Sequence, residues 1–418
     1  MSINGQKEFE LLNKIGFIRV SGSEEELKAA HILKEEIESY GLEATIDPFP
    51  VDEAIIHHVK LEVLEPYYKE YEARAYKCCG NASLEGEIVY VDNGINAVDL
   101  SKMKGKIVLI NGYLRLDAYK RMIENGAIGF ITFQGSLLDK QDEIDIDARK
   151  LRKNLRDCGL IPGMNVHVSS AHDMVKNHAS KVRITIEQEN VTLTSHNVYA
   201  TIEGTEKPNE VITFGAHYDS VPFSTGVYDN GAGSVIIMDI MKQFKENPPK
   251  RTLQFCWFGS EEVGLEGSKY YAKTYEDKLK DNVLMINVDV AGAVLGSDVA
   301  MATSEACLVD YVNYIACDTG FSINVKQDIY SSDSIPFADK GVPAINFCRF
   351  GPQGAAFIHN RHDVIDYLSA DSLEATANFV YEFARRIEAT QVFPVPRTMP
   401  QNMVEKVDNY LAKKKDKK

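Results

Sequence analysis

The second half of the sequence alternates between two apolar patterns, and this alternation is the strongest constraint on the fold. Short apolar runs are typical of buried strands, and longer segments with apolar residues three and four apart are typical of helices. Strands that alternate with helices form a largely parallel sheet covered on both faces, so we predict an α/β fold with a mixed, largely parallel sheet flanked by helices. The predicted strands are 197–202, 211–216, 252–258, 283–290 and 343–348, and the predicted helices are 233–244, 265–275, 306–317 and 370–388.

The first half of the sequence has a different character. Ser23 followed by Glu26 is a capping box, and apolar residues then recur at helical spacing until Gly41, which predicts an amphipathic helix. Short predicted strands and turns follow, with few chemically suggestive side chains, and indicate a separate mainly β module. The predicted parts are an N-terminal part of the main domain at 1–66, the inserted module at 67–190, the remainder of the main domain at 191–395 and a C-terminal tail at 396–418.

The composition excludes several classes of protein. The 418 residues are 44% hydrophobic and 26% charged, close to the averages for globular proteins. A formal net charge of −15 argues against a nucleic-acid partner, because phosphate backbones require a concentrated basic surface. No stretch has the roughly 20 consecutive apolar residues of a membrane span, and residues 1–20 lack the apolar core of a signal peptide. Seven scattered cysteines fit a reducing compartment, so we expect a cytoplasmic protein without a membrane partner.

Acidic and imidazole side chains follow three of the predicted strands. His217 comes directly after the second strand, Glu261 and Glu262 follow the third, and Asp289 lies at the end of the fourth. In an open α/β sheet the ligand crevice lies outside the carboxyl ends of the strands. These side chains are therefore expected to meet at one edge of the sheet.

Their chemistry suits a site for two divalent metal ions. Asp229 lies in a glycine-containing turn before a predicted helix and is well placed to bridge two ions. Asp219, two residues after His217, is expected to orient the imidazole ring. The adjacent carboxylates of Glu261 and Glu262 can divide the labour, one binding metal while the other moves the proton of the attacking water.

These motifs resemble peptidase family twenty-eight of clan MH, the di-zinc aminopeptidases. The resemblance rests on Ala-His-Tyr-Asp-Ser-Val at 216–221, Asp-Asn-Gly-Ala-Gly at 229–233, Gly-Ser-Glu-Glu-Val-Gly at 259–264, Asn-Val-Asp at 287–289, and His359 with Asp363. It implies the zinc-exopeptidase (phosphorylase/hydrolase-like) fold and the hydrolysis of peptides that have a free N-terminus.

The resemblance also implies roles for individual residues. The implied ligands are His217 and Asp289 for one zinc, Glu262 and His359 for the other, and Asp229 between them. Glu261 becomes the general base, and the peptide bond between Asp229 and Asn230 is expected to be cis. Asp219, as the carboxylate that orients His217, is counted with Glu261 among the expected catalytic residues. Zinc follows from the resemblance, and mixed nitrogen and oxygen ligands also accept cobalt or manganese.

The inserted module has a resemblance of its own. Gly-Lys-Ile-Val-Leu-Ile at 105–110 and Asn-Gly-Ala-Ile-Gly at 125–129 resemble the protease-associated domain, an insert found in several peptidase families. The module also precedes the first histidine of the site, as in such families.

Some alternatives stay open at this stage. His362 competes with His359 as the last ligand, and we favour His359 because its spacing to Asp363 matches the family pattern. Ser334 stands where many relatives have a histidine, and Ile358 where some have a tyrosine, which affects substrate contacts but no metal ligand. The rival functions are a carboxypeptidase or dipeptidase with the same metal site, and a non-catalytic receptor-like relative.

Overall fold

The computed structural model describes residues 3–92, 94–111 and 114–413. The chain forms two compact units, the first made of Met1–Val51 and Thr194–Lys418 and the second of Asp52–Leu193. The long strands β1 (Ala44–Glu65) and β8 (Lys181–Ile202) contribute residues to both units. The second unit thus begins at residue 52, whereas the sequence suggested 67, because β1 continues across this boundary without a turn.

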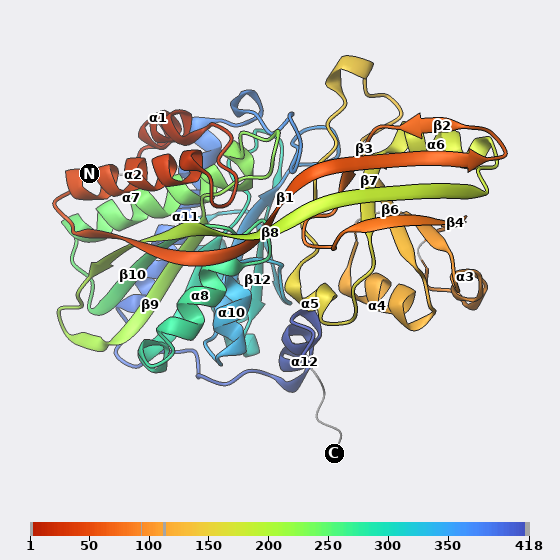
Figure 1. Cartoon of the computed structure of the whole chain (residues 1–418). Helices are drawn as coiled ribbons and strands as arrows, with labels where there is room; N and C mark the ends of the chain where they lie inside the picture. The colour runs from red at the N-terminus through yellow and green to blue at the C-terminus, as the bar shows by residue number, and fades with distance from the viewer. Residues whose placement is uncertain (1–2, 93, 112–113, 414–418) are drawn as a thin grey trace. The chain divides into compact units, whose positions relative to one another are not determined.

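The sheet of the first unit is mixed and largely parallel, as predicted (Figure 1). Its strand order is β13-β12-β14-β11-β9-β10-β8. Neighbouring strands from β14 to β10 are parallel, and β8 and β12 run antiparallel to β10 and β14. The strands not yet bounded are β9 (Lys207–His217), β10 (Arg251–Phe258), β11 (Asn282–Val288), β12 (Ser297–Thr303), β13 (Ile323–Gln327) and β14 (Ala344–Phe350).

Helices flank this sheet. Helix α7 contacts β9, β10 and β11 and is covered by α1 and α11, while α10 contacts β11, β14 and α8. The core between these layers includes fully buried Phe214, Trp257 and Ile286. The bounds are α1 (Gly5–Ile15), α2 (Glu24–Ser39), α7 (Ala232–Glu246), α8 (Glu266–Thr274), α9 (Ala306–Thr319), α10 (Ser334–Asp339) and α11 (Ala370–Glu388).

The second unit has a hydrophobic core of its own and contains helices as well as strands. Strands β4, β5, β6 and β7 are parallel neighbours, and β3 closes this row antiparallel to β7. Its resemblance to the protease-associated domain stays a prediction. The bounds are β2 (Lys69–Tyr71), β3 (Ala73–Ala75), β4 (Ala82–Val91), β5 (Ile107–Ile110), β6 (Gly129–Gln134), β7 (Gly163–His167), α3 (Ala97–Lys102), α4 (Leu116–Glu124), α5 (Lys153–Arg156) and α6 (Val168–Lys176).

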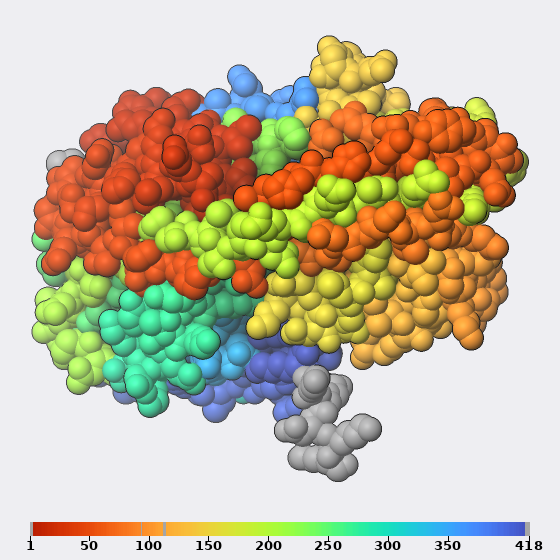
Figure 2. All heavy atoms as spheres, in the orientation of Figure 1, coloured from red at the N-terminus to blue at the C-terminus, as the bar shows by residue number. Residues whose placement is uncertain are grey.

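The expected C-terminal tail contains a packed helix, α12 (Gln401–Tyr410). Its buried side chains Met403 and Val407 face inward, and it contacts α10 at the surface of the first unit (Figures 1 and 2). Near the end of the chain Lys413 pairs with Asp339, and residues 414–418 lie outside the described residues. No helix in the described part of the chain is long and apolar enough to cross a bilayer.

Candidate metal centre

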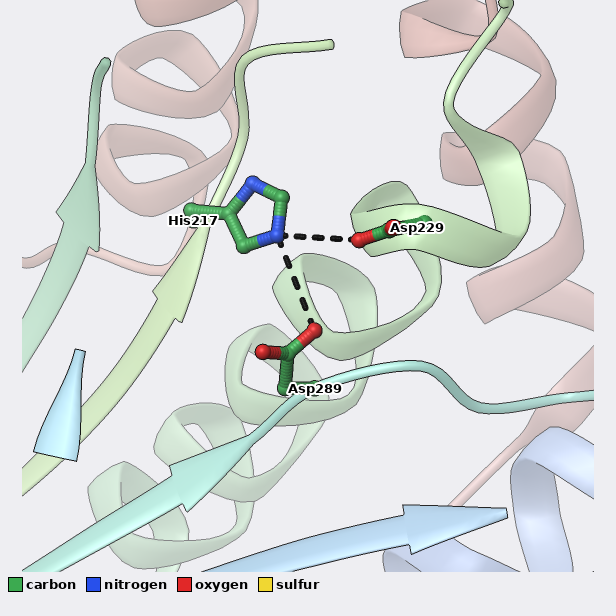
Figure 3. A group of neighbouring side chains, drawn as sticks. All are labelled: His217, Asp229 and Asp289. Carbon is green, nitrogen blue, oxygen red and sulfur yellow. Dashed lines mark hydrogen bonds and ion pairs between the residues drawn. The ribbon is translucent and has the colours of Figure 1, made fainter. Parts of the chain in front are cut away.

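Three of the predicted ligands meet at the carboxyl ends of parallel strands. His217 is the last residue of β9, Asp289 directly follows β11, and Asp229 lies in the turn Val227–Gly231 that precedes α7. The Nε2 atom of His217 lies 3.1 Å from Oδ1 of Asp229 and 3.6 Å from Oδ1 of Asp289 (Figure 3). All three side chains are buried, so they form a compact group of one imidazole and two carboxylates that could hold a metal ion.

A second group shares Asp229 with the first. The Nε2 atom of His359 lies 3.1 Å from Oε2 of Glu262 and 3.2 Å from Oδ2 of Asp229. The two oxygens of Asp229 therefore face different histidines, which is the arrangement a bridging carboxylate requires. In each group the candidate ligand atoms lie within 4.8 Å of one another.

The two groups differ in exposure. The side chain of His217 is 1% exposed, whereas that of His359 is 42% exposed. His362 is also exposed and belongs to neither group among the described residues. A catalytic metal keeps a coordination position open for substrate, and the more exposed group offers such access.

The electrostatics of the site are those of an acidic cluster. Burial lowers the pKa of His217, but the neighbouring carboxylates of Asp219, Asp229 and Asp289 outweigh this and raise the pKa well above 6.5. Burial raises the pKa of Glu262 and Asp289, because a carboxylate loses hydration there. Carboxylates gathered in a buried place are expected to be paired with cations, and the mixed nitrogen and oxygen donors suit a divalent transition metal.

Asp219 contacts both the histidine and the glutamate pair. Its Oδ1 lies 3.4 Å from Nδ1 of His217, although this nitrogen has no well-oriented hydrogen bond to any described residue. The same carboxylate accepts the backbone N–H groups of Glu261 at 3.0 Å and Glu262 at 3.2 Å. Asp219 thus fixes the backbone of the glutamate pair in addition to lying beside the imidazole, a contact that the sequence did not predict.

Glu261 lies beside the two ligand groups without belonging to either within the described residues. It is 9% exposed. Burial raises its pKa well above the ordinary value; His217 opposes this rise, and the nearby carboxylates of Glu262, Asp333 and Asp289 add to it. A carboxyl group with a raised pKa is suited to accept and return a proton near neutral pH.

Asp363 and Asn230 hold the turn that carries Asp229. Asp363 accepts the backbone N–H groups of Tyr228 at 2.8 Å and Asp229 at 3.2 Å, and burial raises its pKa to about 7. The Asn230 side chain donates to the carbonyl of Val288 at 2.7 Å, which ties the turn to the end of β11. The peptide bond between Asp229 and Asn230 is cis, so this expectation is confirmed.

Left-handed backbone conformations occur at, or directly next to, three of the predicted site residues. Ser260 precedes Glu261 with φ of 57°, Val290 follows Asp289 with φ of 57°, and His359 itself has φ of 58°. Positive φ is uncommon for residues other than glycine and an outlier for a β-branched residue such as valine. Such conformations persist where the surroundings impose them, and they cluster at functional sites.

Three buried charged residues near the site escaped the sequence analysis. Glu26 had been assigned only to a capping box, and Asp333 and Arg19 had been given no role. Arg19 donates to the carbonyls of Tyr218, Thr225 and Gly226, and thereby holds the loop between His217 and Asp229. Burial lowers its pKa to about 10. No local pattern marks these residues, because their partners lie far away in the sequence.

Comparisons with known proteins agree with these observations. Residues 197–384 match the model of Peptidase family M28, which confirms the resemblance over the main part of the first unit. Aminopeptidase YwaD of Bacillus subtilis (strain 168) is 30% identical over 233 residues, which are 52% of this chain and 49% of that protein. Leucine aminopeptidase 1 of Metarhizium robertsii is 27% identical over 263 residues, which are 53% of this chain and 64% of that protein. The chain therefore spans about half to two thirds of the length of these two relatives.

Two solved structures are similar along nearly the whole chain. The aminopeptidase from Aneurinibacillus sp. strain AM-1 superposes with a TM-score of 0.74 and 24% identity, covering 94% of this chain and 96% of that chain. BSAP, a zinc aminopeptidase from Bacillus subtilis, superposes with a TM-score of 0.76 and 20% identity, covering 94% of this chain and 98% of that chain. These likenesses establish the fold, a mixed α/β sheet flanked by helices.

Proposed function

We propose that this chain is a metal-dependent aminopeptidase that binds two metal ions, and that both are zinc. One ion is assigned to His217 and Asp289, the other to Glu262 and His359, and Asp229 lies between them. The observation that carries the proposal is that Asp229 belongs to both groups, with one oxygen facing His217 and the other facing His359. The family match and the relatives named aminopeptidase or zinc aminopeptidase support it.

The residues fit this role by their chemistry. Imidazole nitrogen and carboxylate oxygen are ordinary ligands of zinc, and cobalt and manganese accept the same set. Two bound divalent ions would supply positive charge that polarises the peptide carbonyl. They would also lower the pKa of water, so that it loses a proton easily and becomes a better nucleophile. The remaining chemistry belongs to side chains of the chain itself.

Glu261 is assigned the proton transfer. Its buried carboxylate accepts the proton of the attacking water and then gives it to the amine of the leaving peptide. The raised pKa of this group matches the need to hold the proton between the two steps. Asp219 accepts the backbone N–H group of Glu261 and thereby keeps this residue in place.

One peptide assay tests the proposal. The purified protein is incubated with one peptide in two forms, free and acetylated at the N-terminus, with and without a chelator, and the products are read by mass spectrometry. We expect stepwise loss of N-terminal residues from the free form alone, abolished by the chelator. Trimming from the other end would instead show a carboxypeptidase. If metal is bound and neither form is cleaved, general peptidase activity is refuted and a binding role gains weight.

A further inference from the structure

Glu26 makes contacts that a capping box does not explain. The Ser23 side chain caps α2 as predicted, accepting the backbone N–H of Glu26 at 3.1 Å. The Glu26 side chain, however, reaches away from the helix and is fully buried. Its Oε2 accepts the N–H of Gly22 at 2.7 Å, and its Oε1 accepts the hydroxyl of Ser195 at 2.8 Å and the N–H of Ser260 at 3.1 Å.

The last of these contacts completes a row. Three consecutive backbone N–H groups, those of Ser260, Glu261 and Glu262, donate to two buried carboxylates, Glu26 for the first and Asp219 for the other two. A buried N–H group without a partner is costly, so this row fixes the backbone at the end of β10. It is the segment from which Glu261 and Glu262 project.

Ser260 has an unusual backbone conformation and close neighbours at this contact. Ser260 has φ of 57°, and its hydroxyl lies 2.5 Å from that of Ser21, just before α2. Gly259 permits the close approach, because a Cβ atom there would lie 2.8 Å from Oε1 of Glu26. The N-terminal segment and the strand end therefore fit together around the Glu26 carboxylate.

A carboxylate is a costly choice for this place. Burial raises the pKa of Glu26 to about 8, the negative charge of Asp219 adds to the rise, and hydrogen bonds from Gly22, Ser195 and Ser260 oppose it. An amide or hydroxyl side chain accepts hydrogen bonds without the cost of a buried charge. A role in the site offers a reason for retaining the acid.

We propose that Glu26 is a positioning residue that sets the geometry of Glu261 and Glu262 by holding the N–H group of Ser260. Its effect on turnover rests on the proposed peptidase activity, whereas its effect on Glu262 rests only on the proposed metal site. The two effects are therefore measured separately.

The test uses the full chain with Glu26→Gln and Glu26→Ala, and Glu25→Gln as the matched control. Glu25 is the exposed neighbour on the same helix, so its change alters the charge of α2 without touching the site. Each metal-free protein is loaded with cobalt chloride, the bound cobalt is counted by elemental analysis, and the visible absorption spectrum is recorded. The zinc-loaded forms are then assayed with leucine p-nitroanilide well below their melting temperatures.

We expect both Glu26 variants to bind cobalt in the wild-type ratio with an altered visible spectrum, because the carboxylate of Glu262 shifts. We expect kcat to fall by about ten- to a hundredfold in Glu26→Ala with KM nearly unchanged, as small displacements of reacting groups cost that much. Glu26→Gln keeps the side-chain volume and one acceptor oxygen, so its kcat should fall less than that of Glu26→Ala. Glu25→Gln should match the wild type in every measurement.

A lower melting temperature with an unchanged cobalt spectrum and unchanged kcat would reduce Glu26 to a structural role and overturn the proposal. If Glu26→Ala does not fold, Glu26→Gln decides the question by the same criteria. If the wild type has no peptidase activity, the proposed function fails, and the cobalt spectra still show whether Glu26 positions Glu262.

Discussion

The adjacent glutamates provide the sharpest test of the assigned roles. Oε2 of Glu262 lies 3.1 Å from Nε2 of His359 within a ligand group, whereas Glu261 belongs to neither group in the described chain. Glu262→Gln replaces one of the three ligands of its group with a poorer one and should weaken that metal site. Losing a residue that only supports a ligand already lowers metal affinity by roughly 10- to 100-fold. We therefore expect Glu262→Gln to lower the affinity for that metal by at least about 100-fold.

Glu261→Gln should leave both metals bound and remove the proton acceptor. General base catalysis contributes roughly 10²- to 10⁴-fold, so kcat should fall by that factor, equivalent to about 3–5 kcal/mol of barrier, with KM little changed.

Metal content by elemental analysis and kcat from a leucine p-nitroanilide assay separate the two effects. Glu266→Gln, at the start of α8, is the control for loss of a negative charge near this turn. The reasoning is refuted if Glu261→Gln loses metal while Glu262→Gln keeps both ions.

Three further outcomes follow from the same contacts. Asp219→Asn keeps only one acceptor oxygen for the N–H groups of Glu261 and Glu262, so metal titration should show affinity lower by about 10- to 100-fold. Chelation should lower the melting temperature in calorimetry, and adding zinc at about 100 times its dissociation constant should restore about 2.7 kcal/mol of stability; no shift would contradict a metal held by the folded state. Burial, Asp239 and Glu374 raise the pKa of Glu8, so the folded state loses stability as pH rises above the ordinary carboxyl range. Glu8→Gln should therefore stabilise in urea titrations by an amount that grows with pH, at most about 1.4 kcal/mol per unit, and vanishes at acidic pH.

The sequence predicted the features that depend on patterns within short stretches of the chain. Predicted helix 370–388 coincides with α11, and strand 252–258 differs from β10 by one residue, because periodic apolar patterns report directly on buried faces. The convergence of His217, Glu262 and Asp289 followed from the rule that parallel strands end at one edge of the sheet.

The features that the sequence could not reveal depend on contacts between distant segments. Asp363 and Glu26 each hold a backbone N–H group more than 130 positions away, at separations of 134 and 234 residues. A backbone N–H group carries no sequence identity, so no pairing of residue types marks such a contact. The boundary at residue 52 was missed for a related reason, because one strand serves both units without a break.

These hidden contacts share one design. Glu26, Asp219 and Asp363 are buried carboxylates that bind backbone N–H groups next to or within the assigned metal ligands. Ionised carboxylates form stronger hydrogen bonds than neutral acceptors and so fix the backbone more firmly, but burial raises the pKa of Glu26 and Asp363 and thus opposes their negative charge. That charge is unfavourable in the protein alone and favourable around two divalent cations. We therefore expect the same side chains to fix the geometry of the proposed ligands and to favour metal binding, so the protein should be most stable when metal is bound.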